Sequence, residues 1–153
     1  MPPLGVSPPP SAAKRWGLGL LLACALVAPA VAWGVHRQWG WSLTAVSGAW
    51  MTWALLGAPL LEETVFRLGL QAQLERRLVV AAQPSLRRHA TAWAGVAAAA
   101  AFASVHAPQH GWACVAWLVP GLALAALWTG TRRLAWCVGA HAWFNLCLWW
   151  VSR

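Results

Sequence analysis

The sequence predicts an all-α fold, a polytopic transmembrane helix bundle of five to six spans. The first observation is composition, because 60% of the 153 residues are hydrophobic and only 9% are charged, whereas soluble domains carry about 25% charged residues. The second is that the apolar residues form runs close to the roughly 20 residues a helix needs to cross a bilayer. The third is the 14 tryptophans, many of them near the ends of these runs, where indole rings favour the headgroup level.

The amino-terminal residues 1–13 are rich in proline and small side chains, which predicts a disordered leader. Lys14 and Arg15 then precede an apolar run over residues 16–35. The stretch APAVAW within this run has small residues at signal-peptidase spacing, so a cleaved signal is one interpretation. The run is long for a signal peptide, which favours an uncleaved first span. Residues 14–153 are therefore expected to form a single transmembrane helical domain.

The region 41–79 joins an apolar stretch, Pro59 and a segment with two adjacent glutamates. As one helix it would be about 60 Å long, roughly twice the hydrocarbon thickness of a bilayer. A break at Gly57-Ala58-Pro59 gives six spans, and the amides of a helix starting there would favour a carboxylate. A kink there, with residues 63–79 leaving the membrane as an amphipathic extension, gives five. The sequence leaves both arrangements open.

Three further apolar runs predict helices over residues 91–106, 112–130 and 134–151. Arginine pairs lie in the links before the first and before the last of these runs, whereas the link 107–111 has no arginine. Because arginine-rich links stay in the cytoplasm, residues 107–111 are predicted to lie on the outer side. By the same rule Lys14 and Arg15 favour a cytoplasmic amino terminus, which agrees with five spans.

The formal net charge of +8 does not indicate a nucleic-acid partner. The arginines lie in pairs between apolar segments, which is the pattern of topology signals, and they form no basic stripe with interleaved aromatics. The partner that composition predicts is the lipid bilayer. The four cysteines are scattered through apolar runs without a Cys-x-x-Cys spacing, so they are interpreted as buried free thiols.

Ionisable side chains within apolar runs are costly and mark candidate functional sites. Glu63 and Arg67 are four residues apart, so they share a helix face and are predicted to pair. Glu62 points about 100° away from that face and gains no such partner. An unpaired carboxylate in an apolar site is a candidate general base. The alternative is an ordinary glutamate–arginine pair at the membrane surface, which leaves Glu62 without a role.

Two later helices carry histidines with a partner one turn away. Phe102 and His106 are four residues apart at the end of one apolar run, and His141 and Asn145 are four apart within the last. With six spans these groups and Glu62 converge in the outer half of the bilayer, and with five Glu62 lies nearer the cytoplasm. His110 is a weaker candidate, because Pro108 is expected to break its helical register with His106.

Three segments in this order resemble the motifs of a known family. EETVFR matches Glu-Glu-x-x-x-Arg, FASVH matches Phe-x-x-x-His and HAWFN matches His-x-x-x-Asn. Together they are similar to the CPBP family of intramembrane proteases, which includes type II CAAX prenyl endopeptidases and bacteriocin-processing relatives. The resemblance covers a protease core at about residues 50–150. The chain departs from the family pattern where Leu68 separates the arginine from Gly69, and it is shorter than typical members.

The resemblance implies roles for the motif residues. Glu62 would be the general base that activates water, and His106 would hold that water. His141 and Asn145 would stabilise the oxyanion, a role suited to donors in a dry site. The remaining motif residues would be structural or would orient the substrate: Glu63, Arg67 and Phe102. This mechanism needs no metal, although Glu62, His106 and His141 could bind zinc by ligand type.

Other protease chemistries lack their residues in this sequence. Without aspartate there is no aspartyl dyad, and neither His-Glu-x-x-His nor Gly-x-Ser-x-Gly occurs. The leading interpretation is an endopeptidase of a bacterial inner membrane that cleaves near the C-terminal hydrophobic or sorting segment of a membrane-associated or exported protein. One alternative is a non-catalytic protein on the same scaffold, for bacteriocin immunity or partner binding. A transporter is disfavoured, because the two halves of a transporter would be expected to repeat and no such repeat is seen in this sequence.

Overall fold

The computed structural model describes residues 11–40 and 48–151, with side chains from residue 19 onward. In these ranges the chain is helical and contains no strand, as expected for an all-α membrane bundle. The helices are α1 (Ser11–Trp39), α2 (Gly48–Thr52), η1 (Trp53–Gly57), α3 (Ala58–Glu63), η2 (Thr64–Gln71), α4 (Ala72–Leu78), α5 (Pro84–Arg88), α6 (Ala90–Ser104), α7 (Ala107–His110), η3 (Gly111–Trp117), α8 (Leu118–Thr131) and α9 (Leu134–Val151).

Three helical stretches are long and apolar enough to span a membrane within the described residues: Gly19–Trp39, Ala107–Thr131 and Leu134–Val151. The shorter α6 is also apolar. Helix α1 begins at Ser11, inside the segment predicted as a disordered leader, while residues 1–10 lie outside the described part of the chain. The multi-helix membrane protein predicted from composition is confirmed.

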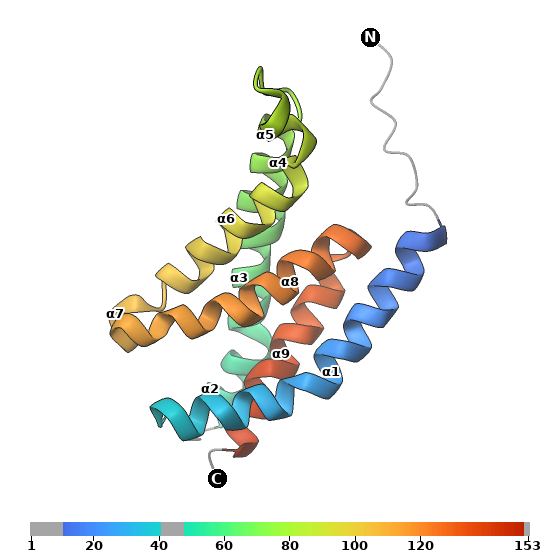
Figure 1. Cartoon of the computed structure of the whole chain (residues 1–153). Helices are drawn as coiled ribbons and strands as arrows, with labels where there is room; N and C mark the ends of the chain where they lie inside the picture. Colours follow the sequence, from blue (N-terminus) through green and yellow to red (C-terminus); the bar gives the residue numbers. More distant parts are fainter. Residues whose placement is uncertain (1–10, 41–47, 152–153) are drawn as a thin grey trace.

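Residues 48–78 form one continuous helical rod, made of α2, η1, α3, η2 and α4 in succession (Figure 1). Gly57 keeps right-handed helical dihedrals, with φ −65° and ψ −55°, and Ala58 does the same. The break at Gly57-Ala58-Pro59, on which six spans depended, is therefore absent. No helix starts freely at Pro59 either, so the expected help from N-terminal amides does not reach the glutamates.

Two segments of this rod, η1 of five residues and η2 of eight, are π-helical rather than α-helical. The amide of Ala58 donates to the carbonyl of Trp53, five residues back, immediately before Pro59. Proline has no amide hydrogen to donate, so the helical hydrogen-bond ladder has to be rearranged at this point. The second wide turn, η2, follows Glu63 directly. Single π-helical turns inside α-helices are frequent at functional sites, and these two flank the segment that carries both glutamates.

The five long helical stretches alternate in direction. The start of α1, helix α5 and the α8–α9 link lie towards one end of the bundle, and the end of α1, α7 and the end of α9 lie towards the other (Figure 1). This is the arrangement expected for five stretches with the arginine-rich links on one side. Helix α9 packs against the rod and against α1, while α8 lies between α6, α9 and α1.

Helices α6 and α8 approach closely because small residues line their contact. Ala94, Ala98 and Ala99 of α6 are fully buried. A Cβ atom at Gly121 of α8 would lie only 3.2 Å from the Cα of Ala99. Small residues let membrane helices approach and pack by van der Waals contact. This packing fixes α6, and with it the position of Phe102 at its carboxyl end.

At the arginine-rich end, one glutamate connects three helices. Both guanidinium Nη atoms of Arg132 donate to the carboxylate of Glu75, at 2.6 and 2.7 Å. The hydroxyl of Thr91 at the start of α6 donates to the same carboxylate at 2.7 Å. Arg132 adopts a left-handed conformation, with φ 53°, where α8 ends. Glu75 therefore ties α4, α6 and the end of α8 together.

Candidate active site

The site begins with Glu63, a carboxylate with no exposed surface in the middle of the helical rod. Its Oε2 accepts a hydrogen bond from Nε of Arg67 at 2.9 Å, and neither side chain is exposed. Its Oε1 lies 3.0 Å from Nδ1 of His141 on α9. The predicted Glu63–Arg67 pair is thus observed, and the structure adds a histidine from 78 positions later in the chain.

The buried polar contacts continue along the rod beyond Arg67. Its Nη1 donates to Oε1 of Gln71 at 2.9 Å. The Gln71 amide then donates to the carbonyl of Ala125 and to the hydroxyl of Thr129, both on α8, at 3.1 and 3.2 Å. The sequence interpretation missed Gln71. The signal was present, because Glu63, Arg67, Gln71 and Glu75 recur at every fourth residue.

The π-helical turn explains how this polar row stays on one face. In an α-helix each step of four residues rotates a side chain by about 40°, so the row from Glu63 to Glu75 would drift by about 120°. The wider turn over η2 contains Arg67 and Gln71 and reduces that drift. The row can therefore face α9 at its Glu63 end and α8 at Gln71.

Glu62 has a different environment from its neighbour. Its side chain is 28% exposed, and its Oε2 lies 3.8 Å from Nε2 of His141, too far for a direct hydrogen bond. That oxygen is itself buried and has no hydrogen-bond partner among the described residues. The structure thus brings Glu62 and His141 close together without joining them by a direct hydrogen bond.

His106 follows the last turn of α6. Its Nδ1 lies 2.8 Å from the backbone carbonyl of Phe102. A carbonyl can only accept a hydrogen bond, so Nδ1 carries the proton and a neutral ring presents Nε2 as an acceptor. His106 is thereby oriented to accept a proton or a hydrogen bond at Nε2.

Phe102 lies between the two histidine rings. Its ring centroid is 5.0 Å from that of His106 and 5.6 Å from that of His141, and Phe66 packs edge-on against it at 5.3 Å. These are ordinary aromatic packing distances. The phenyl ring thus fixes the relative position of two imidazoles that come from different helices.

The position of His110 differs from the one expected from the sequence. His110 stacks on His106, with centroids 6.5 Å apart and planes 19° from parallel. Pro108 lies in the first turn of α7, where its missing amide costs nothing, and the backbone amide of His110 donates to the carbonyl of His106. The prediction that Pro108 separates the two histidines was therefore wrong.

Asn145 lies one turn after His141 on α9. Its Nδ2 donates to the carbonyl of Ala54 on the rod at 2.8 Å. Ala54 lies within the π-helical turn η1. One amide hydrogen of Asn145 therefore holds α9 against the rod, and the second is the hydrogen available to another acceptor.

No group of three histidine, cysteine or acidic side chains is arranged to hold a metal ion in the part of the chain that the structure describes. Glu62 and His141 are close to each other, but the zinc set considered from the sequence also needed His106. The four cysteines are free, as predicted, but only Cys137 and Cys147 are buried, whereas Cys24 and Cys114 are half-buried.

Comparison with known families agrees with this geometry. The family model for Rce1-like type II CAAX prenyl endopeptidases matches residues 44–147. The chain belongs to this family. The match runs from before the rod to Cys147 in α9, so it includes all the motif residues, and α1 lies outside it. No curated protein and no solved structure matches the chain.

Membership of the Rce1-like family makes the chain a membrane protein of a protease family. The CPBP resemblance read from the three motifs is thereby confirmed, as are the helical transmembrane architecture and the CAAX protease-like character. The roles of individual residues and the substrate go beyond this match, and they are taken up as a proposal.

Proposed function

We propose that this Rce1-like protein is an intramembrane endopeptidase in which Glu62 activates the attacking water. The observation that carries the proposal is the buried oxygen of Glu62, which has no hydrogen-bond partner among the described residues and lies 3.8 Å from Nε2 of His141. Glu63, its neighbour in sequence, is fully engaged with Arg67 and His141. Only Glu62 is available to take a proton from water at this place.

His106 is proposed to hold the water through Nε2, to receive from Glu62 the proton that Glu62 takes from that water, and to deliver this proton to the leaving amine as the peptide C–N bond breaks. The bond from its Nδ1 to the carbonyl of Phe102 leaves Nε2 as the acceptor. A base that accepts a proton early and donates it later is the usual role of histidine in acyl transfer. Phe102 supports this role by positioning the ring, as its contacts with both imidazoles indicate.

His141 and Asn145 are proposed to stabilise the oxyanion of the tetrahedral intermediate. Nδ1 of His141 is occupied by Glu63, so only Nε2 can face the substrate. Nε2 can donate only when the Glu63–His141 pair holds two protons, one in the bond between the two groups and one on Nε2. Glu63 and Arg67 are then positioning residues, which hold the ring in this state and orientation.

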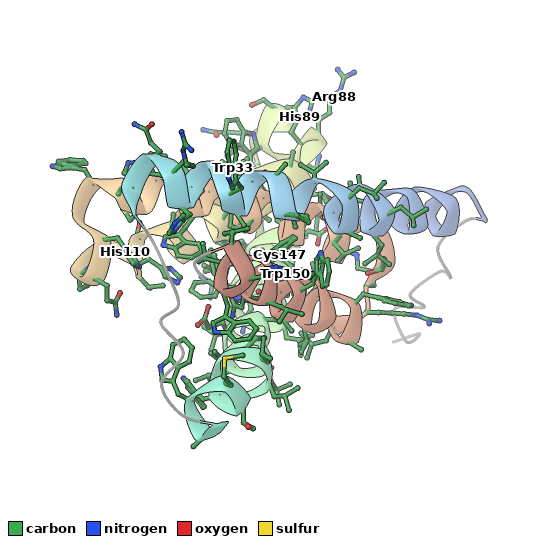
Figure 2. All side chains as sticks on the ribbon, turned by 90° about the horizontal axis from the view of Figure 1, so that it is seen from below. Trp33, Arg88, His89, His110, Cys147 and Trp150 are labelled. Atoms are coloured by element: carbon green, nitrogen blue, oxygen red, sulfur yellow. The ribbon has the colours of Figure 1, made fainter. Side chains whose placement is uncertain are left out.

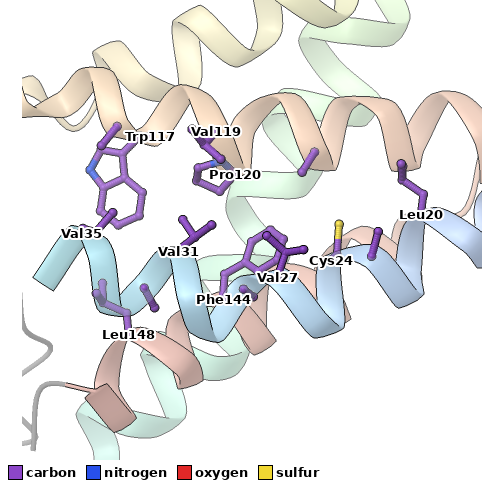
Figure 3. Close-up of a pocket in the computed structure, with 15 residues that line it drawn as sticks. Leu20, Cys24, Val27, Val31, Val35, Trp117, Val119, Pro120, Phe144 and Leu148 are labelled. Atoms are coloured by element: carbon purple, nitrogen blue, oxygen red, sulfur yellow. The ribbon is translucent and has the colours of Figure 1, made fainter.

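The proposed substrate is a membrane-associated or exported protein with an apolar C-terminal or sorting segment. An apolar cavity of about 290 Å³ lies between α1 and α8 and reaches α9 through Phe144 and Leu148 (Figure 3). Trp117 lines this cavity, and its ring lies 4.7 Å from that of His106. An apolar segment bound there would lie beside the proposed catalytic groups. The proposed location is a bacterial inner membrane.

The proposal is tested with membranes or liposomes that contain the full chain and a panel of membrane-anchored reporter proteins with apolar C-terminal segments. Cleavage by the wild-type protein, Glu62→Gln and His106→Ala is compared, each with and without a metal chelator. Glutamine keeps the shape of Glu62 but cannot take a proton, so cleavage is expected to fall by about 10²–10⁴-fold. Ser104→Ala, at an exposed position two residues from His106, serves as the control.

The other outcomes separate the alternatives. Normal cleavage by Glu62→Gln contradicts the role given to Glu62. Loss of cleavage with chelator, restored by zinc, supports a zinc-dependent protease instead. If both variants still support the protein's function in cells and no reporter is cleaved, the result supports a non-catalytic immunity or partner-binding protein.

A further inference from the structure

A second hollow lies away from the proposed catalytic groups, at the arginine-rich end of the bundle. It is a groove of about 590 Å³ between α6 and α8, closed on one side by Leu20 of α1. Most of its surface is apolar, from residues that include Val96, Leu122 and Ala126. Val96 and Leu122 are about half exposed, so the groove opens towards the lipid.

The mouth of the groove is basic. Arg88, at the end of α5, and His89, immediately before α6, both line it and are both exposed. Figure 2 shows the two side chains at the outer edge of the bundle. The first turn of α6 lines the groove through Thr91 and Ala92, and a helix amino terminus carries a partial positive charge.

The protein has no acidic residue left to neutralise this mouth. The whole chain contains three glutamates and no aspartate. Glu63 is paired with Arg67 inside the bundle, and Glu62 lies beside His141. Glu75 is close to the groove through Thr91, but both its oxygens are engaged by Arg132. No acidic side chain of the protein therefore competes with an external anion for Arg88.

We propose that this groove binds an anionic phospholipid. The phosphate would lie between Arg88 and His89 at the first turn of α6, and an acyl chain would lie along Leu20, Val96 and Leu122. Basic pockets between transmembrane helices on the cytoplasmic side bind anionic headgroups in this manner. The volume is within the range of small-ligand sites. The proposal is independent of the peptidase chemistry.

The test measures lipid retention by the purified full chain, using native mass spectrometry after exposure to equal amounts of phosphatidylglycerol and phosphatidylcholine. The wild-type protein is expected to retain phosphatidylglycerol in preference to phosphatidylcholine. Arg88→Gln is expected to weaken that retention about fivefold, the contribution of one basic side chain near a membrane surface. Arg77→Gln removes the same charge from an exposed position outside the groove and is expected to have no effect. Arg88→Lys keeps the charge and is expected to retain most of the binding.

The apolar part of the groove is tested separately. Ala126 is exposed in the groove, so Ala126→Trp fills it without disturbing the core and is expected to reduce retention of both lipids. Equal loss in Arg77→Gln and Arg88→Gln, or equal retention of the two lipids by wild type, would overturn the proposal. Full displacement of phosphatidylglycerol by inorganic phosphate would also overturn it, because the site would then recognise a free anion.

Discussion

Glu62 and Glu63 are adjacent in sequence and both lie near His141, but their hydrogen bonds and their burial differ. Glu63 has no exposed surface and binds Arg67 and His141, whereas Glu62 retains a buried oxygen without a hydrogen-bond partner among the described residues. Adjacent residues on a helix point about 100° apart, so one carboxylate can face the bundle interior while the other faces the site. Glu63 is therefore proposed to hold the structure of the site, and Glu62 to carry out the chemistry.

Asn145 provides a test at the scale of a single side chain. If its free amide hydrogen stabilises the oxyanion, Asn145→Ala should lower kcat by about 10²–10³-fold. The variant also loses the bond to the carbonyl of Ala54, which is worth about 1 kcal/mol of stability. Measuring kcat and the melting temperature together separates the two effects. A fall in stability with unchanged kcat would assign Asn145 a purely structural role.

Some of these contacts could be predicted from the sequence, and others could not. The Glu63–Arg67 pair follows from a spacing of four residues on one helix, and the structure has it. The contact of His141 with Glu63 joins positions 78 residues apart, which no local pattern specifies. Gln71 was missed because residues 63–79 were interpreted as a possible amphipathic extension, where a glutamine on one face needs no partner.

At the scale of the helices, the continuous rod changes the depth in the membrane at which Glu62 is expected. Without a break at Pro59, Glu62 lies near the middle of the rod, roughly 20 Å along the helix from Glu75. The outer-half position expected with six spans depended on that break. The sequence could not decide between a break and a kink, because proline is compatible with both when neighbouring turns rearrange.

The stability that the contacts of Glu75 contribute to the fold is expected to depend on pH. Hydrogen bonds from Arg132, and a weaker one from Thr91, lower the pKa of Glu75 from its ordinary value of 4.5 despite partial burial. Because the folded pKa is the lower one, this stabilisation is fully present above about pH 4.5 and is lost as pH falls through the folded pKa. Arg132 is partly exposed, so the contribution is about 1 kcal/mol.

The corresponding experiment compares the melting temperature of wild type and Glu75→Gln in detergent at neutral and acidic pH. At neutral pH the variant should melt roughly 2–4 °C lower. The difference should shrink below the ordinary pKa of the carboxyl, because the wild-type link is then lost as well. Arg77→Gln on the same helix should melt like wild type at neutral pH. A difference that stays constant down to low pH would contradict the role of the charged carboxylate.

At the scale of the whole molecule, the fold and the charge distribution predict one topology. Five helical stretches that alternate in direction place α5 and the α8–α9 link on one side, with the end of α1 and α7 on the other (Figure 1). The arginines of α5 and of the α8–α9 link assign the first side to the cytoplasm. Reporter fusions after residues 83 and 132 should therefore be cytoplasmic, and fusions after residues 38 and 109 should be outside.

The topology experiment has a clear opposing result. If the fusions after residues 38 and 83 were found on the same side, the rod would not cross the membrane between them. Composition and apolar runs were enough to predict the helical bundle, because hydrophobicity dominates the choice between membrane and water. They did not determine how the rod continues through Pro59, which depends on the packing of α9 against η1 and α3.

The central claim is that the two neighbouring glutamates have separate functions, and one paired measurement tests it directly. The cleavage rate and the melting temperature are determined for Glu62→Gln and Glu63→Gln in the same lipid. Glu62→Gln is expected to melt like wild type and to lose cleavage. Glu63→Gln is expected to lose about 3–5 kcal/mol of stability, because Arg67 is left as an uncompensated buried charge. Wild-type cleavage by Glu62→Gln, or unchanged stability of Glu63→Gln, would contradict these separate functions.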